Sequence, residues 1–101
     1  MNYKLLRQAI KERTSTDTDI VRVLNVLGIE VSREGFFKVR EERTPSCKIN
    51  KDGSCHDYGS GEHYGDIVAL LFDGYRAFES LPETMNWLCE ELGISKEDYD
   101  E

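Results

Sequence analysis

The side chains of this sequence best suited to chemistry are its thiols and imidazoles, which are common ligands of transition metals. They are Cys47, Cys55, Cys89, His56 and His63, and no two cysteines form a C-x-x-C pair. Cys55 and His56 are adjacent, and adjacent residues of a strand point to opposite faces of a sheet, so one ion would rarely bind both. Cys47 alternates with Ile49, which favours a buried thiol. The sequence leaves open whether Cys47, Cys55, His56 or His63 binds a metal, and His63 could instead contact a substrate or have no such role.

Acid–base and phosphate chemistry have weaker support. The Glu-Glu-Arg segment at 41–43 holds paired carboxylates, but it is typical of a polar loop with local ion pairing. The glycine-rich segment 59–65 precedes a predicted helix and could cradle a phosphate, although Asp66 at that helix start would compete with an anion. There is no P-loop, dinucleotide fingerprint or Ser-His-Asp spacing. We therefore do not expect a complete enzyme.

Length and composition indicate one small folded domain. The chain has 101 residues, of which 39% are hydrophobic and 10% aromatic. No apolar run approaches the roughly 18 residues that span a membrane, and the first residues lack the apolar segment of a secretory signal. We expect a cytoplasmic protein with reduced cysteines and no membrane partner. The oligomeric state, and whether this is a whole protein or one domain of a longer chain, are not predictable.

The net charge of −7 argues against strong non-specific DNA binding, because phosphate-binding surfaces are usually basic. The charge is unevenly distributed. Residues 31–64 contain six Lys/Arg and six Asp/Glu, whereas the rest contains seven and fourteen. The centre is locally neutral and the flanks are acidic.

Helices are predicted at both ends of the chain. The first covers Tyr3–Arg13, and a run of capping residues at 14–17 precedes a second that Gly28 ends. A third covers Asp66–Asp73. The last begins near Pro82 and ends at Gly93.

The middle of the chain predicts strands. Alternation and β-favouring residues occur at 36–40, 46–50 and 54–58, with a tight turn at Lys51–Gly53. We therefore predict an α+β fold with a small three-stranded antiparallel sheet flanked by about four helices. Residues 1–16 would form an N-terminal helical extension, and the acidic end at 95–101 would be frayed.

One stretch carries a family resemblance. It comprises Glu-Arg-Thr-Pro-Ser at 42–46, Gly-Ser-Gly at 59–61 and Gly-Asp-Ile at 65–67. Together these segments resemble the N-terminal CHC-type zinc-finger domain of DnaG-type bacterial DNA primases, over about residues 19–94. The resemblance implies a zinc-ribbon-like sheet and a role in engaging single-stranded template. It covers no equivalent of the primases' catalytic TOPRIM domain, so a non-catalytic module is implied.

The chain departs from the family at the metal site. Aligned on Thr44-Pro45-Ser46, the family's zinc ligands fall on Phe37, Arg40, Asp57 and Ser60, which do not form a thiolate or imidazole set. The resemblance therefore implies a degenerate finger without zinc or another cofactor. We hypothesise that an Arg40–Asp57 ion pair replaces the metal cross-link while Phe37 fills space. The alternative is that Arg40 and Asp57 are ordinary exposed charges.

The family's template-binding surface would map here to basic and aromatic residues of the sheet. They are Lys38, Arg40, Arg43, Lys48, Lys51, His56, Tyr58 and Tyr64. On an exposed sheet face, rings can stack with bases and cations can contact phosphates. The alternative is a solvated sheet edge whose lysines deter strand pairing.

The predicted function is a non-catalytic, primase-finger-like module of DNA replication. It would bind single-stranded DNA, or a replication or mobilisation protein, during the replication of a bacterial chromosome or a mobile element. The alternative is a protein-interaction module whose acidic helices bind a basic partner, without nucleic acid.

Overall fold

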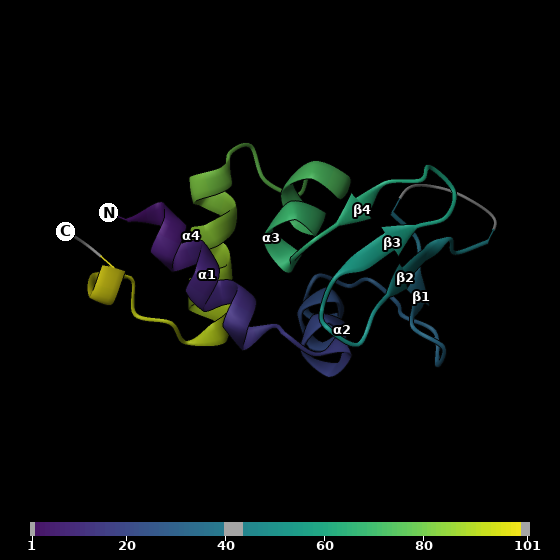
Figure 1. Cartoon of the computed structure of the whole chain (residues 1–101), viewed down its shortest axis with the longest axis horizontal. Helices are drawn as coiled ribbons and strands as arrows, with labels where there is room; N and C mark the ends of the chain where they lie inside the picture. Colours follow the sequence, from purple (N-terminus) through teal and green to yellow (C-terminus); the bar gives the residue numbers. More distant parts are fainter. Residues whose placement is uncertain (1, 40–43, 100–101) are drawn as a thin grey trace.

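The computed structural model describes residues 2–39 and 44–99. Along the chain, helices precede and follow a small sheet (Figure 1). The elements are α1 (Tyr3–Arg13), α2 (Asp17–Val26), β1 (Phe36–Phe37), β2 (Cys47–Ile49), β3 (Cys55–Asp57), β4 (His63–Tyr64), α3 (Ile67–Ala69), the π-helical turn η1 (Leu70–Gly74), α4 (Leu81–Leu92) and the 3₁₀ turn η2 (Lys96–Tyr99). The predicted α+β class is confirmed.

Local capping chemistry sets the helix ends. The side chain of Thr16 accepts a hydrogen bond from the backbone amide of Asp19 at the start of α2, and Ser80 does the same for Glu83 in α4. Gly93 ends α4 in the left-handed conformation with φ of 70°. The predicted bounds of these helices are therefore confirmed to within a few residues.

The sheet has four antiparallel strands in the order β1-β2-β3-β4, one more than the predicted three. The additional strand, β4, is only two residues long and follows a glycine-rich segment, so it shows no alternation by itself. It forms because it pairs with β3, with His63 opposite His56 and Tyr64 opposite Cys55. β1 is shorter than the predicted strand at 36–40, of which Arg40 lies outside the described residues.

Cross-strand register divides the sheet into two faces. Phe37, Cys47, Ile49, Cys55 and Tyr64 point inward and join one hydrophobic core with helix residues such as Leu6, Leu24, Val68 and Leu88. Phe36, Lys48, His56 and His63 occupy the alternate positions, where side chains are half-buried or exposed. Burial alternates in this way because successive side chains of a strand point to opposite faces.

The predicted helix at Asp66–Asp73 changes its winding after one turn. Asp66 caps α3, and the backbone amide of Tyr75 then donates to the carbonyl of Leu70, five residues back, which defines the π-helical turn. Gly74 in this turn lies against the ring of Tyr64, where an added Cβ would be 3.1 Å from Cζ. The wider turn thus brings the backbone close to the sheet.

The molecule is elongated, with extents of 45 × 24 × 22 Å. Figure 1 shows the strands at one end of the long axis and the α1–α4 pair at the other, with α2 and α3 between them. The backbone amide of Asn2 donates to the carbonyl of Tyr99 at 2.7 Å, so η2 packs beside the start of α1. Within residues 2–39 and 44–99, no helix has the length and apolarity required to cross a bilayer.

Candidate nucleic-acid interface

The outer face of the sheet carries a row of aromatic and basic side chains, one from each strand. Phe36 pairs with Lys48, Lys48 with His56, and His56 with His63. These four residues, here called the outer row, therefore lie side by side across all four strands. Tyr58 follows β3 and is 65% exposed next to the row.

Contacts within the row combine rings with a cation. The Nζ of Lys48 lies 5.5 Å from the ring centroid of Phe36, a cation–π distance. The ring of His56 packs edge-on against Tyr58 with centroids 4.6 Å apart, and lies 5.9 Å from the ring of His63. Such an arrangement presents flat rings and a positive charge on one surface, which are the groups that contact bases and phosphates of single strands.

The structure brings together only some of the predicted binding residues. Lys48, His56 and Tyr58 lie in or beside the outer row, and Lys38 is exposed just after β1. Lys51 is exposed in the turn between β2 and β3, beyond the paired positions. Arg40 and Arg43 lie outside the described residues.

Tyr64 does not lie on the outer face of the sheet, where the sequence interpretation placed it. It is only 7% exposed, because its pairing with Cys55 places it on the inner face, against Gly74. The outer row instead contains Phe36 and His63, which the sequence interpretation did not assign to the template-binding surface. Phe36 could have been found, because the alternation that points Lys38 outward also points Phe36 outward. His63 required the pairing of β4, which no local signal reveals.

Two carboxylates near the row limit its positive potential. Glu62 is exposed immediately before His63, and Asp52 is exposed in the β2–β3 turn. The hydroxyl and then the backbone amide of Ser54 donate to Asp52 and hold the pKa of its carboxyl below the ordinary value of 3.8, with a smaller contribution from the charge of His63. Asp52 therefore stays negative at neutral pH.

The positions that align with the family's zinc ligands do not fit that metal. Phe37 is fully buried and stacks with Tyr75 at a centroid distance of 6.1 Å, while the hydroxyl of Tyr75 donates to the carbonyl of Lys38. Asp57 is 1% exposed, and its Oδ1 accepts from the hydroxyl of Ser46 at 3.1 Å and the amide of Gly59 at 2.9 Å. Packing and hydrogen bonds therefore hold Phe37 and Asp57 in place.

Ser60 is the last of the positions that the sequence interpretation aligned with zinc ligands. It is exposed, and its hydroxyl accepts from the amide of Glu62 at 3.2 Å. A phenyl ring, a hydrogen-bonded carboxylate and a turn hydroxyl do not supply the thiolate or imidazole ligands of a structural zinc site. The proposed partner of Asp57, Arg40, lies outside the described residues.

The thiols and imidazoles also lie apart. Cys47 and Cys55 are buried on the inner face, whereas His56 and His63 are on the outer face. Within residues 2–39 and 44–99, no three His, Cys, Asp or Glu side chains are grouped as metal ligands would be. This arrangement disfavours one ion bound by all four residues.

Comparison of the chain with protein-family models, curated proteins and solved structures finds no match. The resemblance to the primase finger therefore stays an interpretation of the sequence.

Proposed function

We propose that this chain is a non-catalytic module that binds single-stranded DNA across the outer face of its sheet. The observation that carries the proposal is the outer row of Phe36, Lys48, His56 and His63, with Tyr58 beside it. Rings supply sequence-tolerant stacking, and the lysine supplies a phosphate contact. The β-sheet also holds these side chains at a fixed spacing before the single-stranded DNA binds, which lowers the entropic cost of binding.

The charge of the protein predicts modest affinity with limited salt dependence. The net charge is −7, and within residues 2–39 and 44–99 Lys38 and Lys48 are the lysines at or beside the row. Two phosphate contacts to a single strand give a slope of about −1.4 in the logarithm of the association constant against the logarithm of salt concentration. Stacking, rather than charge, would then supply most of the binding free energy.

Fluorescence anisotropy of a labelled oligothymidine at about 50 and 200 mM salt tests the proposal, with duplex DNA as the competitor. We expect saturable binding that favours the single strand. Lys48→Glu should weaken it and make the slope shallower by about 0.7. Lys4→Glu is the matched control, because Lys4 is exposed on α1, at the opposite end of the molecule.

Stacking is tested with Tyr58→Ala, which should weaken binding by about tenfold with little change in the salt slope. Absence of saturable binding by the wild-type protein at low salt would refute the proposal.

The cellular role in the proposal comes from the primase-finger resemblance. That role is DNA replication of a bacterial chromosome or mobile element in the cytoplasm, in which the module binds single-stranded DNA or a replication or mobilisation protein. The alternative is a protein-interaction module, favoured by the charge of the C-terminal region, where residues 78–99 contain one Lys and six Asp/Glu. Glu83, Glu90 and Glu91 are exposed on α4. A basic protein partner captured without any DNA affinity would support this alternative.

A further inference from the structure

A groove of about 500 Å³ borders the outer row at the edge of the sheet. One wall is the loop at residues 28–32, after α2, and the others are Phe36, Lys38 and Pro45. The volume lies within the range of small-molecule sites, about 300–1,000 Å³. The groove therefore has room for a flat ring system.

The groove and the outer row share one residue, Phe36. Phe36 belongs to the row and also lines the groove, and Lys48 lies over the same ring. Lys38, exposed after β1, is the lysine that lines the groove. Single-stranded DNA that lies on the sheet would reach the groove without leaving the protein surface.

The chemistry of the walls suits a nucleotide. Ile29, Val31 and Pro45 are half-buried apolar side chains, which suit the faces of a base, while Lys38 suits its phosphate. The loop is held against β1 by two hydrogen bonds. The backbone amide of Ser32 donates to the carbonyl of Phe36 at 2.8 Å, and the amide of Phe36 donates to the hydroxyl of Ser32 at 3.0 Å. These bonds form the groove before any ligand enters.

We propose that one base of the bound single strand leaves the outer row and inserts into this groove, against Phe36, Ile29 and Val31, with its phosphate on Lys38. This inference rests on the proposed function, because it deepens the same interface. It assigns the groove to a nucleotide, since the groove is continuous with a surface of rings and lysines. It also adds a binding position beyond those that stack on the sheet.

The test is NMR of the full chain, labelled at its methyl groups and backbone amides, with unlabelled hexathymidylate. We expect intermolecular nuclear Overhauser effects between a thymine and the methyl groups of Ile29 and Val31. A second measurement compares Glu30→Lys, which changes a residue of the groove, with Glu34→Lys, which makes the same charge change at an exposed residue outside it. We expect about fivefold tighter binding for Glu30→Lys and less than twofold for Glu34→Lys.

The outcomes separate the two proposals. If the oligonucleotide shifts the signals of His56 and Tyr58 but gives no contact with Ile29 or Val31, and both variants bind alike, the groove inference is wrong and the proposed function stands. If hexathymidylate does not bind at all at low salt, both are wrong. If a leucine-containing tetrapeptide, used as a second probe, gives the groove contacts in place of the oligonucleotide, the groove belongs to a protein partner and the inference is overturned.

Discussion

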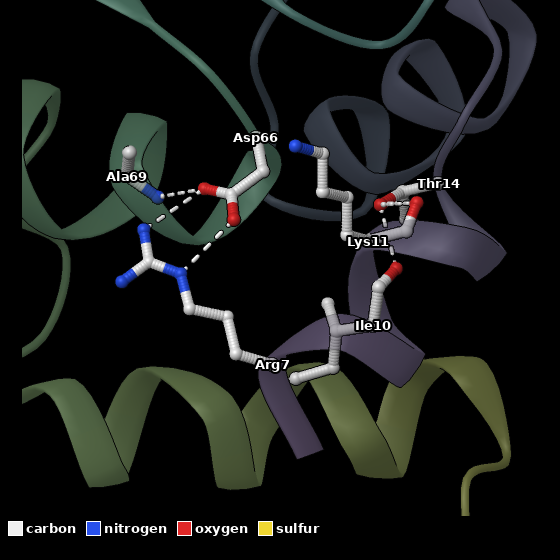
Figure 2. A network of polar contacts seen from close by, with 6 residues as sticks. All are labelled: Arg7, Ile10, Lys11, Thr14, Asp66 and Ala69. Carbon is white, nitrogen blue, oxygen red and sulfur yellow. Dashed lines mark hydrogen bonds and ion pairs between the residues drawn. The ribbon is translucent and has the colours of Figure 1, made fainter. Parts of the chain in front are cut away.

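Arg7 and Asp66 join the first helix to the start of the third through two parallel hydrogen bonds. Arg7 Nε donates to Asp66 Oδ2 at 3.0 Å, and Arg7 Nη2 donates to Asp66 Oδ1 at 3.1 Å. Figure 2 shows that Asp66 Oδ1 also accepts from the backbone amide of Ala69, at 2.8 Å. One carboxylate therefore caps α3 and fixes α1 beside it. Because Gly65 alone separates β4 from Asp66, this pair also lies close to the end of the last strand of the sheet.

Asp66 should make stability depend on pH in the acid range. Burial alone would raise the pKa of this carboxyl, but the hydrogen bonds from Arg7 and Ala69 and the charges of Arg7 and Lys11 outweigh it and lower the pKa below 3.8. A carboxyl whose pKa is lower in the folded state stabilises the fold above its unfolded pKa, and this contribution is lost as pH falls below about 3.8. We expect Asp66→Asn to reduce the free energy of unfolding at pH 7 by about 1–2 kcal/mol.

Urea unfolding between pH 2 and 7 measures this effect. The difference between wild type and Asp66→Asn should shrink toward zero at the acid end, because both side chains are then neutral. Glu90→Gln, at an exposed position of α4, is the control and should follow the wild type throughout. A constant difference between wild type and Asp66→Asn across this range would contradict the linkage.

Gly53 fixes the β2–β3 turn against the junction of α1 and α2. Its φ is 88°, and a Cβ placed on it would lie 2.2 Å from the carbonyl oxygen of Thr14, which is backbone and cannot rotate away. We expect Gly53→Ala to lower the free energy of unfolding by about 2–4 kcal/mol. The left-handed conformation and the displacement of the Thr14 backbone both contribute. Thermal denaturation of the wild type and of Gly53→Ala measures this loss of stability.

Gly28→Ala is the matched control for that experiment. Gly28 has φ of 80° but no atom within 4 Å of the added Cβ, so only the conformational cost of about 1 kcal/mol applies. Equal losses in the two variants would show that the contact with Thr14 does not matter.

Features set by interactions between neighbouring residues were predicted correctly from the sequence, and features set by contacts between distant residues were not. The bounds of α1, α2 and α4 were predicted well because capping residues such as Thr16 and Gly93 act within one turn. Tyr64 was placed on the wrong face because the orientation of a two-residue strand depends on its pairing with β3, which alternation cannot reveal. The π-helical turn was missed because the apolar pattern of residues 66–73 does not distinguish a π-helical turn from a continuing α-helix.

The three thiols should be protected from alkylation in the native state. Cys47, Cys55 and Cys89 are free and buried. Burial, together with the charge of Asp52, raises the pKa of Cys55 to about 12, and burial raises the pKa of Cys89. At pH 8 only about one Cys55 in 10⁴ is then a thiolate, which is the reactive form. Mass spectrometry after iodoacetamide treatment should find little modification without denaturant and three modified thiols with it. Rapid native labelling of Cys55 would mean that its strand opens.

Asp57 offers a test of the sequence hypothesis that an ion pair with Arg40 replaces the metal. Its Oδ1 accepts from Ser46 and Gly59, so Asp57→Ala should lower the free energy of unfolding by about 1–3 kcal/mol. Asp57→Asn keeps an oxygen acceptor and removes only the charge. If the charge pairs with Arg40, Asp57→Asn should cost more than 1 kcal/mol and should cost much less in an Arg40→Met background.

Urea unfolding of the two single variants and the double variant gives the coupling free energy of that pair. We expect about 1–3 kcal/mol if Arg40 and Asp57 cross-link the sheet in place of zinc. A coupling near zero would show that the charge of Asp57 does not act through Arg40 and would refute the ion-pair hypothesis. In that case, packing of Phe37 against Tyr75 would be the main substitute for the ion, and Phe37→Ala should cost about 3–5 kcal/mol.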